Sequence, residues 1–245
     1  MTEKPVALIV GAGDYIGAAI AKRFAKGGFT VCMGRRNSEK LAPLVTEIDA
    51  AGGEAHAFTM DARDEDSVAS VFAEIEKTIG PLELVIFNVG GNVFFPIRET
   101  TSRVFRKVWE MSCFAGFLTG REAATYMGKR GKGSIFFTGA TASVKGSSGF
   151  SAFAAGKHGL RALAQSMARE LGPENIHVAH LVIDAGVDTA FVKEIYRKRG
   201  VDPDDLPPNS LMNPESVAEA YWLLHHQTPD AWTFELDLRP HREKW

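Results

Sequence analysis

The chain has 245 residues, 45% of them hydrophobic, which is enough to bury one sizeable core, so we expect a single domain over residues 1–245. Lys and Arg number 28 against 30 Asp and Glu, and the formal net charge of -2 excludes the basic field of a nucleic-acid-binding protein. No apolar run is long enough for a bilayer, no signal peptide precedes the first strand, and the two cysteines lack metal spacing, so we expect no membrane partner, no metal and a cytoplasmic location.

A glycine-rich turn follows the first predicted strand. Residues 6–10 form an unbroken apolar run, typical of a strand buried on both faces of a parallel sheet. Gly11, Gly13 and Gly17 then mark a tight turn, and helical spacing begins at Ile16. This arrangement suits a dinucleotide pyrophosphate, because glycine lets the backbone approach the phosphates and the first helical N–H groups point at the anion. The alternative is an ordinary β–α turn that needs small residues.

The second predicted strand, residues 29–34, ends at Arg35 and Arg36. In dinucleotide folds, the residue at this position faces the adenosine ribose: an acid binds the 2′-hydroxyl, whereas arginine suits a 2′-phosphate. The window contains two arginines and no acid, so the sequence favours NADP over NAD. Two solvated arginines at a strand end are the alternative.

Strand and helix patterns then alternate, with a helix over 38–51, a strand over 54–59, a helix over 64–78 and a strand over 82–87. Asp61 follows the third strand, where it would accept a hydrogen bond from an adenine amine, cap the next helix, or do both. The fourth strand ends at Asn88.

The second half continues the alternation, with strands over 134–138, 177–183 and 232–238 and helices over 101–129, 150–171 and 214–227. The pattern predicts an α/β fold: a Rossmann-type, doubly wound, parallel seven-stranded sheet with helices on both faces. We expect His177 and His180 on a partly exposed strand, and Asn213 as the N-cap of the last helix. The amphipathic segment within 189–212 is either a substrate lid or a surface helix and loop.

The order of motifs resembles the short-chain dehydrogenase/reductase family over nearly the whole chain, through the glycine turn, Asp61, Asn88-Val89-Gly90, Lys157 and Ala185-Gly186-Val187-Asp188-Thr189. The resemblance implies a nicotinamide cofactor, with Thr189 at its carboxamide and Lys157 at its ribose. The implied cofactor-binding residues are Gly11, Gly13, Asp14, Tyr15, Ile16, Gly17, Arg35, Arg36, Asp61, Ala62, Asn88, Val89, Gly90, Lys157, Gly186, Val187 and Thr189. It also implies a homodimer or homotetramer built on the two long helices.

The catalytic positions depart from the family pattern. Phe153 replaces the tyrosine that donates a proton to a carbonyl oxygen, Ala140 replaces the serine that holds this oxygen, and Cys113 replaces the asparagine of a water relay. Tyr15 also stands in place of the middle glycine of the phosphate turn, and Ala185 in place of a proline. Of the four usual catalytic residues, only Lys157 remains. Loss of a general acid costs about 10²–10⁴-fold in rate, so alcohol–ketone interconversion by the family mechanism is disfavoured.

Two functions stay open. One is an NADP-dependent oxidoreductase with an altered proton path, acting on an iminium, a conjugated double bond, or a carbonyl protonated by water near Lys157. The other is a nucleotide-binding homologue without turnover, with a regulatory or structural role. The substrate would be a hydrophobic or aromatic small molecule, because the expected pocket wall consists of the lid and of Val93, Phe94, Phe95, Ala140, Phe150 and Phe153.

Apolar residues on the two long helices exceed what one helix face needs against its own sheet, which favours a subunit contact through Phe105, Trp109, Phe117, Leu163, Met167 and Leu171. The charged tail that ends in Trp245 either packs on a neighbouring subunit or is free.

Overall fold

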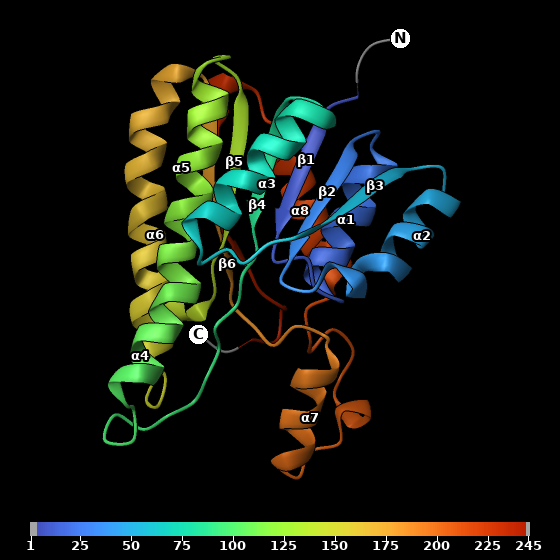
Figure 1. The fold of residues 1–245 in the computed structure, drawn as a ribbon. Helices are drawn as coiled ribbons and strands as arrows, with labels where there is room; N and C mark the ends of the chain where they lie inside the picture. Colours follow the sequence, from blue (N-terminus) through green and yellow to red (C-terminus); the bar gives the residue numbers. More distant parts are fainter. Residues whose placement is uncertain (1–3, 244–245) are drawn as a thin grey trace.

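A parallel seven-stranded sheet forms the centre of the computed structural model, which describes residues 4–243. The spatial order of the strands is β3-β2-β1-β4-β5-β6-β7. Their bounds are β1 (Val6–Val10), β2 (Thr30–Arg35), β3 (Glu54–Thr59), β4 (Leu82–Phe87), β5 (Gly133–Thr138), β6 (Ile176–Ile183) and β7 (Glu235–Leu238). The predicted doubly wound Rossmann-type fold is therefore confirmed (Figure 1).

Helices cover both faces of the sheet (Figure 1). One core is shared with α3 (Glu65–Thr78), α5 (Ala115–Gly128) and α6 (Ser151–Leu171), and the other with α1 (Ile16–Lys26), α2 (Ala42–Ala50) and α8 (Pro214–His225). The two remaining helices are α4 (Ser102–Trp109) and α7 (Ala190–Lys198), and α7 projects from the body below the sheet (Figure 1). As predicted, Asn213 caps α8, with its Oδ1 accepting a 2.9 Å hydrogen bond from the N–H of Glu215.

Every neighbouring strand pair is parallel, so the carboxyl ends of the strands meet at one edge. The strand order reverses direction beside β1, which lies between β2 and β4. In open α/β sheets, ligands bind at such a switch point, outside the carboxyl ends of the strands. The segments that follow β1, β4, β5 and β6 are thereby brought to the same place.

The expectation that His177 and His180 lie on a partly exposed strand is wrong, since both side chains are buried. β6 is an interior strand because β7 pairs with its outer edge. The imidazole of His177 stacks on Trp232 with a centroid distance of 4.9 Å, and the Nδ1 of His180 lies 3.1 Å from the carboxylate of Glu235. The predicted strand over 232–238 is also too long, because it begins only at Glu235.

The long helix predicted over 101–129 contains a π-helical turn at Glu110–Phe114 between α4 and α5. The surplus of apolar residues predicted for the two long helices is only partly present. Met167 and Leu171 are buried in the chain's own core, whereas Phe105, Trp109 and Phe117 remain 41%, 39% and 39% exposed. Trp245 lies outside the described residues.

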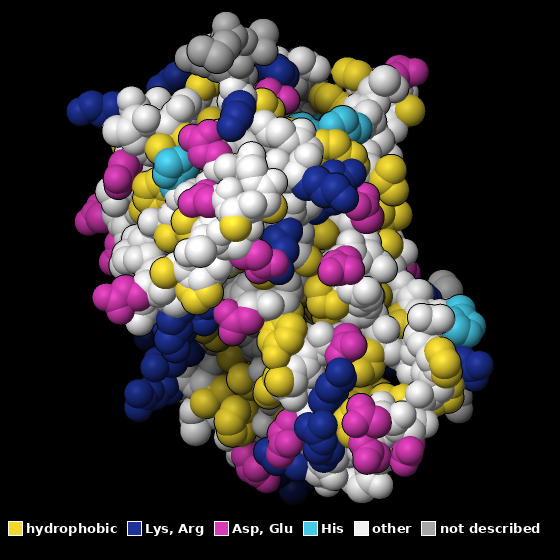
Figure 2. Space-filling model, turned by 90° about the vertical axis from the view of Figure 1, so that its right-hand side faces the viewer, with side chains coloured by type: hydrophobic (Ala, Val, Ile, Leu, Met, Phe, Trp, Pro, Cys, Tyr) yellow, Lys and Arg dark blue, Asp and Glu magenta, His cyan; other side chains and the backbone are white. Residues whose placement is uncertain are grey.

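Acidic and basic side chains are interspersed over the face shown in Figure 2, so no field of one sign covers it. In residues 4–243, no helix is both long and apolar enough to span a membrane. The same stretch contains no group of three or more His, Cys, Asp or Glu side chains that could hold a metal ion.

Candidate functional site

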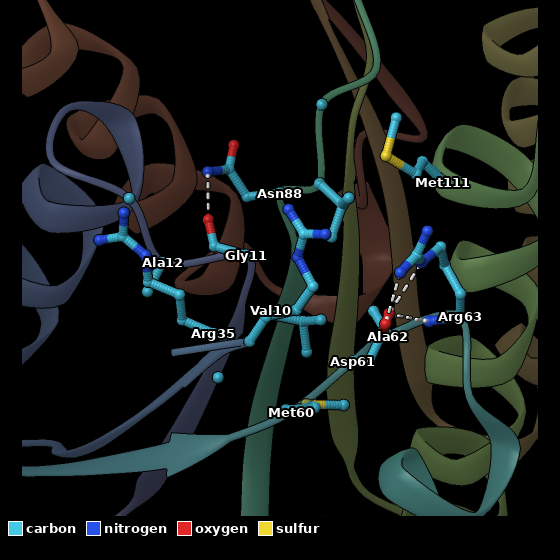
Figure 3. A pocket seen from close by; sticks show the side chains of 15 residues that line it. Val10, Gly11, Ala12, Arg35, Met60, Asp61, Ala62, Arg63, Asn88 and Met111 are labelled. Carbon is cyan, nitrogen blue, oxygen red and sulfur yellow. Dashed lines mark hydrogen bonds and ion pairs between the residues drawn. The ribbon is translucent and has the colours of Figure 1, made fainter. Parts of the chain in front are cut away.

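A cavity of about 220 Å³ opens at the carboxyl ends of β1, β2 and β4 (Figure 3). The cavity is lined by most of the residues that the sequence predicts to bind a cofactor. These are Gly11, Gly13, Arg35, Arg36, Asp61, Ala62, Asn88, Val89 and Gly90. Met60, Arg63 and Met111 also line it and were not predicted. Asp14, Tyr15, Ile16, Gly17, Lys157, Gly186, Val187 and Thr189 line a second, adjoining cavity of about 830 Å³, which shares Gly11, Gly13 and Asn88 with the first.

The glycine turn is shaped by the chain's own contacts. Gly11 has a φ of +83°, and a Cβ there would lie 2.9 Å from the carbonyl oxygen of Asn88. A Cβ at Gly17 would lie 2.8 Å from the Cα of Ala12. At Gly13, by contrast, a Cβ would meet no atom within 4 Å. The open space at Gly13 fits a bound phosphate group, whereas Gly11 and Gly17 are required by the fold itself.

Three arginines, Arg35, Arg36 and Arg63, line the small cavity. Arg35 forms a 3.0 Å ion pair with Asp14 of the glycine turn, and Arg36 is exposed. Arg63 contacts both carboxylate oxygens of Asp61, at 2.9 and 2.6 Å (Figure 3). These hydrogen bonds hold the pKa of the Asp61 carboxyl below its usual value.

The interpretation of Asp61 as the N-cap of α3 is wrong. Asp64 is the N-cap, and its Oδ1 accepts a 2.8 Å hydrogen bond from the N–H of Ser67. Asp64 directly precedes the first helical residue, while Asp61 lies three residues earlier and is turned toward Arg63. The spacing Asp-x-Arg in the sequence is the signal that could have revealed this pair.

The side chain of Asn88 joins the ends of three strands. Its Nδ2 donates to the carbonyl of Gly11 at 3.3 Å, and its Oδ1 accepts from the hydroxyl of Thr138 at 3.0 Å. The phenol of Tyr221, fully buried on α8, lies 2.7 Å from the Thr138 hydroxyl and donates to it. Tyr221 was not predicted, because a buried aromatic residue on a helix has the pattern of an ordinary core residue.

Lys157 is a buried cation at the junction of β4 and β5. Its side chain is 3% exposed, and its Nζ donates to the carbonyls of Thr138 at 2.7 Å and Val89 at 3.3 Å. Burial lowers the pKa of the ammonium group to about 8. The group is therefore mostly protonated at neutral pH and close to titration.

The three positions that were predicted to depart from the family's catalytic pattern lie in apolar surroundings. Phe153 and Ala140 line the larger cavity together with Lys157, and the Nζ of Lys157 is 6.0 Å from the ring centroid of Phe153. Phe153 is only 7% exposed and belongs to an apolar cluster with Val108 and other small side chains. Cys113 lies in the π-helical turn, where burial raises the pKa of its thiol, and it does not line this cavity.

The predicted apolar pocket wall is only partly correct. Ala140, Phe150 and Phe153 line the large cavity, but the lining does not include Val93, Phe94 or Phe95. Phe94 instead packs edge-on against Phe150, with a centroid distance of 5.3 Å, and stays 62% exposed. The sequence-based wall also missed two basic side chains of the lining, Lys145 and Arg199.

The two ends of the segment 189–212 lie next to each other. Thr189 caps α7, with its Oγ1 accepting a 3.1 Å hydrogen bond from the N–H of Val192. Val187 and Met212 form a parallel bridge that joins the two ends of the segment. No residue of α7 is buried, although Phe191, Val192 and Tyr196 line the large cavity.

Comparisons with known proteins agree with this geometry. The family model described as short chain dehydrogenase matches residues 5–200. A crystal structure of a short-chain dehydrogenase from Rhodopseudomonas palustris is 55% identical, with a TM-score of 0.83 over 97% of this chain and 99% of that chain. A metagenomic short-chain oxidoreductase in complex with NADP is 25% identical, with a TM-score of 0.81 over 97% of this chain and 98% of that one.

A curated short-chain dehydrogenase/reductase of Armillaria gallica is 32% identical over 176 residues, which cover 71% of this chain and 67% of that protein. The family match therefore extends over the glycine turn, Asn88 and Lys157, and reaches the end of α7. The chain belongs to the short-chain dehydrogenase family of oxidoreductases.

Proposed function

We propose that this protein is an NADP(H)-dependent oxidoreductase in which the proton does not come from the family's tyrosine. The observation that carries this proposal is the continuity of the large cavity, which extends from the glycine turn past Lys157 to Phe153 and α7. A dinucleotide seated on the turn would have its reactive end beside the space for a substrate. The nicotinamide supplies the hydride when bound.

The choice of NADP rests on the charges at the adenosine end. Arg36 is exposed, has no ion pair in residues 4–243, and lines the small cavity. Asp14 would repel a phosphate, but its charge is offset by Arg35. The similar metagenomic oxidoreductase in complex with NADP supports the same choice, whereas a 7α-hydroxysteroid dehydrogenase that is also 25% identical was solved with NADH.

The proton would come from the Lys157 ammonium or from a water molecule beside it. Lys157 is the titratable side chain that lines the cavity next to Phe153, and its lowered pKa allows it to release a proton near neutral pH. The proton acceptor would be a carbonyl oxygen of the substrate. Reduction of an iminium or a conjugated double bond would depend less on the proton donor that Phe153 cannot provide. We propose the segment 189–212 as the lid of this site, since its two ends are held together at Val187 and Met212.

The packing of Phe153 also supports a second candidate. Its ring is enclosed by an apolar cluster, and Ala140 offers no hydroxyl to hold a substrate oxygen. A nucleotide-binding homologue without turnover would keep Asn88 and Lys157, because both side chains bond the ends of the strands.

One experiment separates these candidates. A ligand at about 100 times its Kd stabilises a fold by about 2.7 kcal/mol, so a thermal-shift assay will detect NADPH binding. NADPH oxidation is then followed with a panel of aromatic ketones, imines and enones. Binding with turnover supports the oxidoreductase, and binding without turnover on any compound supports the second candidate. The absence of a thermal shift with NADPH and NADH would reject both.

We also propose a homodimer or homotetramer that uses the exposed side of α4 and α5. Trp109, Phe114 and Phe117 stack in a row on this side, with centroid distances of 5.9 and 6.1 Å. Rows of exposed aromatic side chains are typical of subunit contacts. Light scattering should report a mass above one chain at micromolar concentration, and Phe117→Lys should lower this mass.

We also propose a cytoplasmic location, since Cys32 and Cys113 are unpaired.

A further inference from the structure

The lining of the large cavity includes two exposed basic side chains on separate segments. Lys145 lies in the segment between β5 and α6, and Arg199 directly follows the last residue of α7. Both line the cavity together with apolar side chains that include Phe150, Phe153 and Phe191. The site therefore combines an apolar wall with two cations.

Neither cation is used by the protein itself. Within residues 4–243, Lys145 and Arg199 form no ion pair and no side-chain hydrogen bond. The other basic residues of α7 are paired: Lys193 with Asp188 at 2.7 Å, and Arg197 and Lys198 with Glu194 at 4.0 and 3.8 Å. The paired cations of α7 are absent from the cavity lining, whereas the unpaired Arg199 belongs to it.

Carboxylates in the same lining offset only part of this charge. Asp14 is paired with Arg35, so Glu243 is the one lining carboxylate with no ion pair in the described chain. Against it stand Lys145, Arg199 and the ammonium of Lys157. A solvated lysine or a basic residue at a helix end would each be unremarkable alone. Their convergence on one cavity, beside an apolar wall, points to an anionic ligand.

We propose that the substrate is an aromatic or other apolar carbonyl compound that carries a carboxylate, and that Lys145 and Arg199 bind this carboxylate. The inference rests on the proposed oxidoreductase function and specifies its substrate class. The carboxylate would remain unchanged in the reaction. The carbonyl carbon gains the hydride, the carbonyl oxygen gains one proton, and NADPH leaves as NADP⁺.

The test uses 4-acetylbenzoate and its uncharged methyl ester, which share the ring and the reducible carbonyl. The wild-type protein with NADPH should have a KM at least 10-fold lower for the acid than for the ester. Lys145→Gln and Arg199→Gln should each raise the KM for the acid about 10-fold and leave the ester unaffected. The matched control is Lys198→Gln, which removes a paired cation of the same segment outside the cavity lining and should change neither substrate.

Three results would overturn the inference: equal KM values for acid and ester in the wild-type protein, no effect of either cavity variant on the acid, or weaker NADPH binding in both variants. The last result would mean that the cations bind cofactor phosphates.

If neither ketone is reduced, the proposed oxidoreductase function fails first, and the anion site is tested by binding alone. Calorimetry would then titrate 4-acetylbenzoate, benzoate and octanoate into the protein with NADPH. Binding of any of these acids that is lost in Lys145→Gln and Arg199→Gln, but kept in Lys198→Gln, supports the site. Absence of binding of all three to the wild-type protein rejects it.

Discussion

The phenol oxygen of Tyr15 accepts a 2.9 Å hydrogen bond from the backbone N–H of Ala190, the first residue of α7. This contact ties the glycine turn, in which Tyr15 was predicted to replace a family glycine, to the start of the proposed lid. Tyr15 is 38% exposed and supports little of the core. Tyr15 can therefore be mutated to test this contact without loss of the fold.

Tyr15→Phe should increase hydrogen exchange at residues 190–192 about 5-fold, because one hydrogen bond of about 1 kcal/mol is lost. The melting temperature should change by only a few degrees. Exchange measured by mass spectrometry checks this, with Tyr196→Phe as the control on the same helix. Unchanged exchange at 190–192 would show that the hydroxyl does not hold α7.

Arg36→Gln should weaken NADPH binding about 10-fold and leave NADH binding unchanged, since a charge-assisted contact to the 2′-phosphate is worth about 1.5–3 kcal/mol. Arg36 is the better target because Arg35 is already paired with Asp14. Calorimetry with both nucleotides is the measurement, and Lys40→Gln, at an exposed cation on the next turn, is the control. An equal loss for both nucleotides would argue against NADP selectivity.

Phe153→Tyr combined with Ala140→Ser should raise NADPH-dependent reduction of an aromatic ketone by roughly 10²–10⁴-fold. Both positions line the large cavity beside Lys157, so the new hydroxyls would face the substrate space. The gain should be lower if Cys113 replaces the relay asparagine, as the sequence predicts. Phe150→Tyr adds a phenol to the same cavity at a different position and should give no gain. A double variant that binds NADPH without any gain would contradict this account of the site.

The pH dependence of turnover should follow Lys157. Below pH 8, its ammonium is charged and can supply a proton, and kcat should fall about 10-fold per pH unit once the pH exceeds the pKa of about 8. The folded-state pKa lies below the ordinary value of 10.5, so the folded state binds fewer protons than the unfolded state between pH 8 and 10.5. The burial cost, about 3 kcal/mol below pH 8, is thus relieved as the pH rises through this window.

Unfolding linked to Lys157 therefore cannot explain a loss of activity above pH 8. Circular dichroism at each pH provides the control for the rest of the fold. A kcat that stays flat from pH 6 to 10 would show that Lys157 does not deliver the proton.

The fold could be predicted well from local patterns, because strands such as β1 and β4 are short apolar runs and the helices between them have a helical period. The sequence also predicted that the site residues would gather at the carboxyl ends of the strands, since a parallel sheet brings these ends to one edge. The burial of His177 and His180 could not be predicted, because it depends on β7, which joins the sheet more than 50 residues later along the chain.

The sequence allowed us to predict which residues belong to the site, but not which hydrogen bonds they form. Asn88 and Lys157 were identified, but their bonds to Thr138 and to the carbonyl of Val89 come from segments distant in sequence. Tyr221 was missed for the same reason, because a core tyrosine looks ordinary until its partner is known. Arg63 was missed although its partner Asp61 lies only two residues earlier in the chain.

The contact between α1 and α8 joins an early helix of the chain to the last α-helix of residues 4–243. Trp222 of α8 covers Phe24 at a centroid distance of 5.3 Å, and the guanidinium of Arg23 lies 3.8 Å from its ring. Synthesis runs from the N-terminus, so this apolar side of α1 emerges long before its cover. A nascent chain that stops before residue 214 would leave this apolar surface uncovered, and exposed apolar surface makes an incomplete chain prone to aggregation.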